Sequence, residues 1–373
     1  MDAFDDYVIA QIASYLPSPL NAPLRATCAR FRAIIDAPGK LSPNALLSRG
    51  TLLGSEEICA IAHNAGATDY NEMIAAASSA RNAHLCTLAR DWGAEDFNSM
   101  LQSATYAQSR ELCELAYDWG ARDCDCMLYA AATVGNRELC DLACAWGAAA
   151  EPQFMLQGAA RGGHRDLCIL ARDMIAASRE RVCYDIALES AACGGHRAIC
   201  ELIHQWILDE HQDCRYTWAL RQSAHCGHRD LCVLVREWAR AENREVSYAS
   251  MLHFATDGNH RELCELAREW MSDNHQQSTF SDMLDIAAYN GNRALCELAR
   301  EWGDAVGTEW QFNSMLISAT DGGSRDLCVL AREWGATDYD CMLAKAMQGG
   351  HHDLCDLARE WILDASRLQR SAH

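Results

Sequence analysis

Cysteine and histidine are the side chains of this chain with the clearest capacity for chemistry. The 373-residue sequence contains 20 cysteines and 14 histidines. Three local groups have metal-ligand character: Cys124-Asp125-Cys126, His225-Cys226-Gly227-His228 and His351-His352. Structural zinc sites need a second Cys-x-x-Cys or His-x-x-x-His pair at a suitable spacing, and none of the three groups has one. We therefore expect turn histidines, no metal site and no cofactor.

Catalytic motifs give no support to an enzymatic function. The sequence has no phosphate-binding loop, no Gly-x-Ser-x-Gly elbow and no His-Glu-x-x-His helix. Those motifs are the usual sequence signs of phosphate chemistry, acyl transfer and metal-assisted hydrolysis. We expect no catalysis by this chain alone.

Eleven of the cysteines occupy one position of an internal repeat, in which a Leu-Cys pair is followed six residues after the cysteine by Trp, as in Leu263-Cys264 with Trp270. The repeat cysteines are Cys59, Cys86, Cys113, Cys140, Cys168, Cys200, Cys232, Cys264, Cys296, Cys328 and Cys355. Successive ones would lie roughly 10 Å apart if the helices pack side by side, which is too far for a disulfide. We expect buried free thiols in a reducing compartment.

The internal register of each repeat predicts two helices joined by a turn. An apolar pair, usually Met-Leu, stands thirteen residues before each repeat cysteine, and Met283 to Ala288 shows the helical spacing of apolar residues that follows it. A Gly-Gly-His turn, as at residues 162–164, or a turn with Asn or Ser then precedes the second helix. Gly supplies a positive φ that ends one helix, and Asn or Ser can cap the next.

The second helix carries one apolar stripe. Leu263, Leu266, Ala267 and Trp270 fall at i, i+3, i+4 and i+7, so we expect them to form one buried face. Arg261 and Glu265 can pair on the other face for about 0.2–0.5 kcal/mol. Because burial of each Trp is worth on the order of 4–6 kcal/mol before entropy is subtracted, we expect the Trp stripe rather than the charges to stabilise the repeats.

These repeats resemble the ankyrin repeat. That unit opens with Thr-Pro-Leu-His, continues through an Ala-Ala helix and a Gly-His turn, and closes with Gly-Ala. Here Met-Leu stands at the opening, Gly163-His164 and Gly350-His351 match the turn, and Trp334-Gly335-Ala336 matches the close, over roughly residues 41–364. The 27-residue repeats leave no room for the usual β-hairpin finger. Compact arrays of this kind resemble those encoded by giant DNA viruses of amoebae.

Longer joints between consecutive repeats suggest where a partner would bind. The interval from a repeat cysteine to the next apolar start is 14 residues four times, 15 once and 19 five times in succession. Most longer joints also replace the helix-stopping Gly after Trp, with Ile207, Ala239 and Met271 in its place, so we expect the second helix to run one more turn.

Insertions that recur at one joint should project along one edge of the array, where repeat proteins often recognise partners. The target-binding candidates on that edge are Arg179, Glu180, His211, Arg215, Glu242, Arg244, Asn274, His275, Thr308 and Glu309. The alternative is length variation in solvent loops without a binding role.

The first forty residues differ from the repeats and resemble an F-box. A helix ending in Tyr15-Leu16-Pro17 is followed by a second helix with Cys28, Arg30-Phe31 and Ile34-Ile35. Phe4-Asp5 stands where an F-box usually has Leu-Pro, and Thr27 occupies the apolar place before the cysteine. The resemblance implies binding to the Skp adaptor of a cullin-RING ubiquitin ligase. The residues it places at or beneath that contact are Phe4, Ile12, Leu16, Pro17, Leu20, Leu24 and Cys28. The alternative is a terminal cap that shields the first repeat.

Charge and hydropathy bound the class of partner. The formal net charge is −20, which opposes binding to nucleic acid or anionic lipid and favours basic protein surfaces. The sequence has no run of 18 apolar residues, so we expect a chain without a membrane partner that works in the cytoplasm, with the nucleus as a second site.

The sequence thus predicts an all-α protein in two parts. Residues 1–40 form an F-box-like helical domain, and residues 41–373 form an ankyrin-like helical-repeat solenoid of about eleven helix-turn-helix repeats of 27–32 residues with reduced β-fingers. The expected function is that of an adaptor, in which the solenoid captures an unknown target protein and the N-terminal part engages the Skp adaptor. The alternative is a scaffold or decoy that sequesters a host protein without any ubiquitin-ligase coupling.

Overall fold

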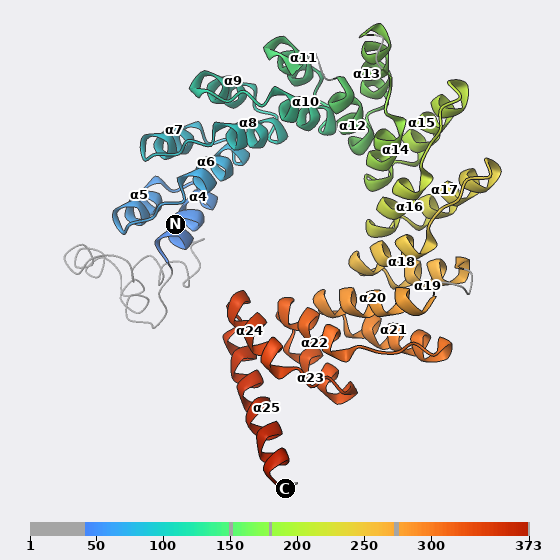
Figure 1. The fold of residues 1–373 in the computed structure, drawn as a ribbon. Helices are drawn as coiled ribbons and strands as arrows, with labels where there is room; N and C mark the ends of the chain where they lie inside the picture. The colour runs from blue at the N-terminus through green and yellow to red at the C-terminus, as the bar shows by residue number, and fades with distance from the viewer. Residues whose placement is uncertain (1–41, 149–151, 179–180, 272–275, 372–373) are drawn as a thin grey trace, which may run out of the picture. The chain divides into compact units, whose positions relative to one another are not determined.

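The computed structural model describes residues 42–148, 152–178, 181–271 and 276–371. Within these ranges the chain forms 22 helices, labelled α4 to α25, and no strand (Figure 1). The expected all-α helical-repeat fold is confirmed. The expected domain boundary near residue 40 lies outside the described residues.

Helices follow one another in eleven pairs, one for each repeat cysteine. Five pairs belong to a compact unit that ends at Val182, and six belong to a second unit that begins at Cys183. The pairs of the first unit are α4 (Pro43–Leu52) with α5 (Glu56–Asn64), α6 (Tyr70–Ser79) with α7 (Ala83–Asp91), α8 (Phe97–Tyr106) with α9 (Arg110–Trp119), α10 (Cys124–Thr133) with α11 (Arg137–Trp146), and α12 (Pro152–Gly162) with α13 (Arg165–Ser178).

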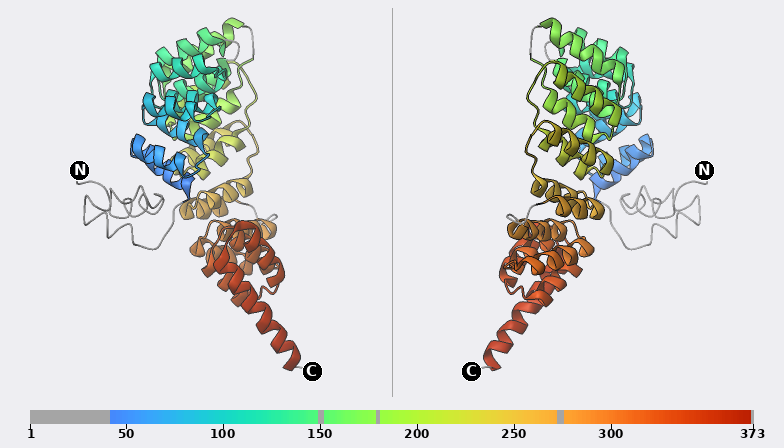
Figure 2. Two further views of the ribbon diagram at one scale, coloured as in Figure 1. Left: turned by 90° about the vertical axis from the view of Figure 1, so that its left-hand side faces the viewer. Right: turned by 90° about the vertical axis from the view of Figure 1, so that its right-hand side faces the viewer.

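The second unit repeats the same plan. Its pairs are α14 (Tyr184–Cys193) with α15 (Arg197–Asp209), α16 (Tyr216–His225) with α17 (Arg229–Ala241), α18 (Tyr248–Asp257) with α19 (Arg261–Trp270), α20 (Gln276–Tyr289) with α21 (Arg293–Val306), α22 (Phe312–Asp321) with α23 (Arg325–Trp334), and α24 (Tyr339–Gly349) with α25 (His352–Ser371). The last of these, α25, is the longest and runs well past its partner (Figure 2).

Within each compact unit, the first helices of consecutive pairs pack against one another in chain order. The buried residues are those that keep their type from repeat to repeat. Met251, Leu252 and Ala255 of α18 and Leu263 and Cys264 of α19 are all 0–2 % exposed. Burying a Leu or Met side chain is worth about 1.5–3 kcal/mol, so this recurring set supplies most of the apolar stabilisation of each repeat.

The turn inside each repeat depends on a backbone position with positive φ, five residues before the repeat cysteine. Gly occupies it in eight repeats, and Arg81, Gln108 and Asn259 occupy it in the other three, with φ between 55° and 61°. The prediction that the turn requires a left-handed residue is confirmed. The predicted side-chain caps are confirmed at four repeats, where Ser55, Asn82, Asn136 and Asn292 accept the N–H of the third helical residue. The prediction is wrong for Ser324, whose side chain makes no cap hydrogen bond, and Ser109 makes none either.

The repeat cysteines are all buried free thiols, as predicted. In α18, the Thr256 hydroxyl donates to the Leu252 carbonyl at 2.8 Å and lies 3.5 Å from the Cys264 Sγ atom. Burial raises the pKa of the Cys264 thiol to about 11. Cys264 therefore remains protonated near neutral pH and acts as a small core side chain.

The tryptophans lie differently from the sequence prediction. Trp206, Trp302 and Trp361 are buried at 4–5 % exposure, but Trp270 is only half-buried. The rings of Trp270 and Tyr248, in the same repeat, meet edge to face with their centroids 5.8 Å apart. The Arg236 guanidinium of the preceding repeat lies over the Trp270 ring, 4.1 Å from its centroid. The expectation that charged residues contribute little to repeat stability was therefore incomplete. An arginine covers the part of the Trp ring that the apolar stripe leaves exposed to solvent.

The arginine-on-tryptophan contact recurs between repeats with the same spacing, from the fourth residue after one repeat cysteine to the sixth after the next. The other examples are Arg90 over Trp119, Arg268 over Trp302, Arg300 over Trp334 and Arg332 over Trp361, at 4.4–4.7 Å. Histidine takes this place at His63 over Trp92 and His204 over Trp238. A cationic or aromatic side chain thus connects the second helices of neighbouring repeats.

The longer joints follow longer second helices, as predicted, with one exception. Four of these helices, α13, α15, α17 and α21, have 13 or 14 residues. However, α19 ends at Trp270, because Met271 adopts an extended conformation with ψ 140°. The extra length is found instead in α20, which has 14 residues. The same insertion length can therefore extend either the second helix before the joint or the first helix after it.

Candidate functional site

Six of the seventeen residues that the sequence predicts for partner binding can be compared with the structure. Those outside the described residues are Phe4, Ile12, Leu16, Pro17, Leu20, Leu24 and Cys28 of the F-box-like part and Arg179, Glu180, Asn274 and His275 of the joints. The described candidates are His211, Arg215, Glu242, Arg244, Thr308 and Glu309. All six lie in the second compact unit.

Two of these candidates are engaged in contacts within the chain. Arg244 forms an ion pair with Asp213 of the preceding joint. Glu242 accepts a hydrogen bond from the Tyr216 hydroxyl, and its side chain is only 22 % exposed. The ion pair connects one long joint to the preceding one, and the hydrogen bond connects a joint to the start of α16. Both charged side chains are therefore engaged within the chain.

The other described candidates are dispersed along the joints. His211 and Glu309 are exposed, and His211 has a positive φ of 51° in the turn after α15. Arg215 is exposed and donates its backbone N–H to Asp185. Thr308 is half-buried and donates its backbone N–H to Gly303. The structure does not bring these four side chains into one cluster.

A second surface, which the sequence analysis did not single out, is formed by the first helices. We call it the first-helix face and define it by the side chains 14, 11, 10 and 7 residues before each repeat cysteine. In α16 these are Trp218, Arg221, Gln222 and His225, all partly exposed. Because the residues 13, 12 and 9 before the cysteine enter the core, the helical period turns the first-helix face away from it.

Residue types on the first-helix face change from one repeat to the next, whereas core positions keep theirs. At eleven residues before the cysteine, consecutive repeats of the second unit carry glutamate, arginine, histidine, aspartate and isoleucine: Glu189, Arg221, His253, Asp285 and Ile317. Because core packing does not restrict the residue type at such a position, the residue can vary to recognise a partner. An alignment of the repeats with one another would have revealed this signal.

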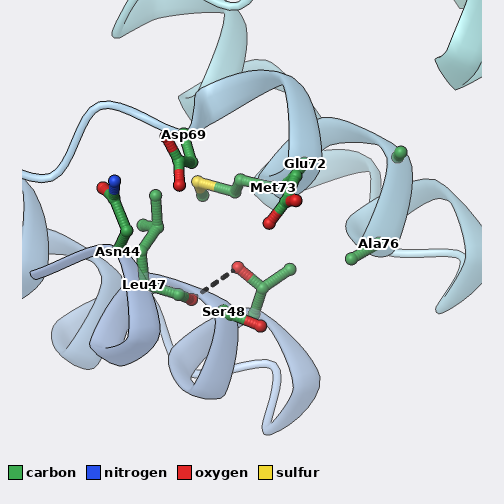
Figure 3. A pocket seen from close by; sticks show the side chains of 9 residues that line it. Asn44, Leu47, Ser48, Asp69, Glu72, Met73 and Ala76 are labelled. Atoms are coloured by element: carbon green, nitrogen blue, oxygen red, sulfur yellow. Dashed lines mark hydrogen bonds between the residues drawn. The ribbon is translucent and has the colours of Figure 1, made fainter. Parts of the chain in front are cut away.

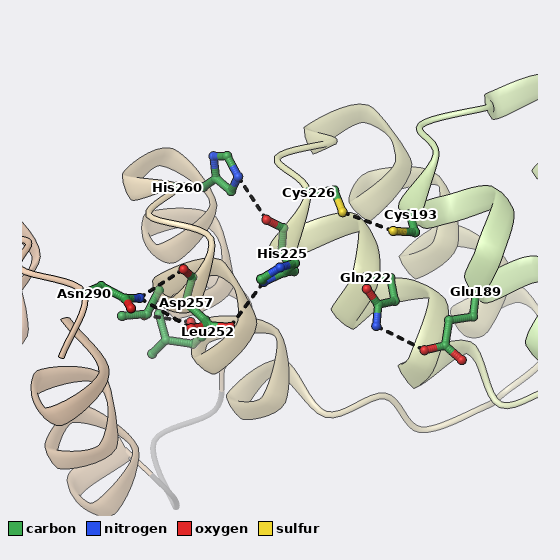
Figure 4. A network of polar contacts seen from close by, with 10 residues as sticks. Glu189, Cys193, Gln222, His225, Cys226, Leu252, Asp257, His260 and Asn290 are labelled. Atoms are coloured by element: carbon green, nitrogen blue, oxygen red, sulfur yellow. Dashed lines mark hydrogen bonds and ion pairs between the residues drawn. The ribbon is translucent and has the colours of Figure 1, made fainter. Parts of the chain in front are cut away.

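In the second compact unit, the first-helix face carries a chain of contacts between repeats (Figure 4). Gln222 donates to the Glu189 carboxylate at 3.1 Å. The Arg221 guanidinium lies 4.1 Å from the Phe254 ring centroid. Each contact joins one first helix to the next, which holds these side chains in fixed positions and lowers the entropy cost of binding a partner.

The same face continues through an acidic segment. His225 Nδ1 lies 3.4 Å from a carboxylate oxygen of Asp257, and the Asn290 amide donates to the Asp257 carbonyl at 3.0 Å. The Ser314 hydroxyl donates to Asp285 at 2.5 Å, while burial raises the pKa of the Asp285 carboxyl. Beside these groups the Tyr289 ring is 57 % exposed. An exposed aromatic ring next to fixed carboxylates suits basic and apolar partner side chains.

The first compact unit has a hollow between α4 and α6, whose lining includes Ser48 and Glu72 of the first-helix face. Asn44, Leu47 and Ser48 of α4, with Met73 and neighbouring residues of α6, line a pocket of about 290 Å³ (Figure 3). Asp69 and Glu72 bring two carboxylates to its wall. Farther along, Tyr106 and Phe154 are 43 % and 36 % exposed. Aromatic and acidic groups therefore mark this face in both units.

The three groups with metal-ligand character do not converge on a metal site. No set of three or more His, Cys, Asp and Glu side chains in the described part of the chain is placed to hold a metal. His228 Nε2 lies 3.2 Å from the carbonyl of Cys193 in the preceding repeat, and His260 and His164 make the same kind of contact. These histidines connect the turns of neighbouring repeats, which agrees with the predicted structural role.

No protein-family model matches this chain, and the curated proteins contain no match to it. Among the described helices, none is long and apolar enough to cross a membrane.

Proposed function

We propose that this chain is a protein-binding adaptor that holds a target protein on the first-helix face of its repeats. The observation that carries this proposal is the contrast within each first helix. Core positions recur in every repeat, while partly exposed positions bear side chains of every chemical class, and inter-repeat contacts hold them in place. A rigid scaffold with a variable surface is the usual architecture of a repeat protein that recognises other proteins.

The chemistry of the surface indicates the kind of target. The chain has a net charge of −20, and the face near Tyr289 presents the exposed carboxylate of Asp257. Complementary charge speeds encounter and selects among partners, while exposed aromatic rings contribute most of the binding energy. The target is therefore a protein that presents basic and apolar side chains together.

Coupling of this captured target to a ubiquitin ligase is the second part of the proposal, and it rests on the F-box-like pattern of residues 1–40. In that mechanism the chain performs no chemistry. It brings a lysine-bearing target close to the ligase, which raises the effective concentration of target at the site of transfer. The alternative is a scaffold or decoy that binds the same target and sequesters it.

Target capture is tested by one substitution on the proposed face and one matched control. Tyr289→Asp places a charge on the first-helix face, whereas Val329→Asp alters an exposed apolar residue of the second helix α23. The tagged full chain and both variants would be incubated with host-cell extract, and the bound proteins quantified by mass spectrometry.

We expect Tyr289→Asp to reduce recovery of the specific partners about tenfold or more, the effect of removing an aromatic hot spot, and Val329→Asp to leave recovery unchanged. Equal recovery with wild-type protein and Tyr289→Asp would contradict binding through this face. Reduced recovery with Val329→Asp alone would move the binding surface to the second helices.

A further inference from the structure

Two cysteines outside the repeat position approach each other across the boundary between neighbouring repeats. Cys193 is the last residue of α14, and Cys226 is the C-cap of α16. Their Sγ atoms are 3.4 Å apart (Figure 4). Both side chains are partly exposed, so reagents in solution can reach them.

We propose that Cys193 and Cys226 form a redox-active dithiol that hydrogen peroxide converts to a disulfide joining two repeats. The first thiolate attacks a peroxide oxygen, which breaks the O–O bond, leaves a sulfenic acid on that cysteine and releases one water after protonation. The second thiolate then attacks the sulfenic sulfur, the S–S bond forms, the S–O bond breaks, and the oxygen leaves as a second water. Two thiols and one peroxide thus give one disulfide and two waters.

The backbone around the pair is held so that the two sulfurs stay close. His228 Nε2 lies 3.2 Å from the Cys193 carbonyl, which connects the turn after α16 to the end of α14. On the same two helices, Gln222 donates to Glu189 at 3.1 Å. A disulfide has its sulfurs about 2.05 Å apart, so the pair must close by about 1.4 Å. Residues at helix ends adjust more readily than those in the middle of a helix.

The repeat cysteines of these two repeats, Cys200 and Cys232, are buried. Burial raises the pKa of the Cys200 thiol and of the Cys232 thiol to about 12. Since peroxide reacts with the thiolate, the buried repeat cysteines react slowly. Exposed cysteines such as Cys341 can be oxidised, but the described structure pairs no second thiol with Cys341. Among the described cysteines, a specific disulfide is therefore expected at the Cys193 and Cys226 pair.

The test is peroxide treatment of the reduced full chain, followed by blocking of remaining thiols and peptide mass mapping. We expect a cross-linked peptide that joins Cys193 to Cys226, lighter by two hydrogens and released by dithiothreitol. Cys193→Ser and Cys226→Ser should each abolish it, whereas Cys341→Ser, a matched change at an exposed cysteine of another first helix, should retain it. Circular dichroism would show that all variants are folded.

A second readout follows the consequence for the fold. The cross-link joins α14 to α16, so the oxidised wild-type chain should unfold at a higher urea concentration than the reduced chain, and the single variants should show no such shift. Peroxide treatment that oxidises Cys341 while Cys193 and Cys226 stay blockable as free thiols would overturn the proposal. Separate oxidation of the two cysteines without a cross-link would overturn it as well.

Discussion

The Arg236 guanidinium lies 4.1 Å from the ring centroid of Trp270, across the boundary between two repeats. Trp270 is the last residue of the second helix of its repeat, and its ring is only partly buried. The arginine of the preceding repeat covers it. Because an arginine covers a tryptophan in this way at five repeat boundaries, one in the first compact unit and four in the second, the contact connects those repeats to their neighbours, and stability depends on neighbours.

This relationship predicts an energetic coupling between the two side chains. Trp270→Ala should cost about 3 kcal/mol of unfolding free energy, and Arg236→Ala about 0.5–1 kcal/mol, because a partly exposed cation–π contact is worth that much. The double variant should cost less than the sum of the two. Urea unfolding of the four proteins would give the coupling energy. If the two single-variant losses of unfolding free energy add exactly in the double variant, Arg236 and Trp270 have no energetic coupling despite their proximity.

The half-buried histidine of the preceding repeat boundary predicts a pH dependence of stability. His204 stacks on Trp238, and its Nδ1 atom is 3.1 Å from the Tyr216 hydroxyl. Burial lowers the pKa of His204, although the Glu242 carboxylate raises it in part. The unfolded chain therefore binds more protons than the folded chain below about pH 6.5, and this contribution to stability is lost as the pH falls through that value.

His204→Phe keeps a stacked ring without the titrating group. We expect the unfolding free energy of wild-type protein to decline more steeply than that of His204→Phe between pH 7.5 and pH 5.5. Identical slopes would mean that His204 has an ordinary pKa. A wild-type chain that gains stability relative to His204→Phe on acidification would mean that Glu242 dominates over burial.

The turns inside the repeats predict a stabilising substitution. Gln108 adopts a φ of 55°, in the left-handed region that costs a residue with a Cβ atom about 1–2 kcal/mol. Gln108→Gly should raise the unfolding free energy by about 0.5–1 kcal/mol after the entropy cost of glycine is subtracted. At the same position of another repeat, Gly195→Ala should destabilise, because its Cβ atom would lie 2.6 Å from the His228 ring. Equal thermal midpoints for wild-type protein and both variants would contradict the assignment of strain.

Much of the repeat fold was predictable because it depends on local chemistry. The spacing of Met251, Leu252 and Ala255 before Cys264 identifies the core, and a turn glycine marks where one helix ends. The early end of α19 was not predictable, because insertion length alone does not say which helix will extend.

The surfaces were harder to predict than the core. Arg236 and Trp270 belong to different repeats, so their contact depends on how repeats stack, which no local pattern reveals. Glu242 was predicted to face a target because it lies in a long joint, but the hydroxyl of Tyr216, which begins the first helix of the same repeat, donates a hydrogen bond to it. Long-range packing thus decides which polar residues of this fold remain available to partners.

The most direct test of the proposed adaptor is calorimetric titration of the purified full chain with the Skp adaptor, supported by co-purification. Leu16→Asp and Leu20→Asp serve as variants of the F-box-like contact, and circular dichroism verifies that each is folded. We predict micromolar or tighter binding by the wild-type chain and loss of binding in both variants. Absence of binding by a well-folded wild-type chain would contradict ligase coupling and leave a scaffold that sequesters its target.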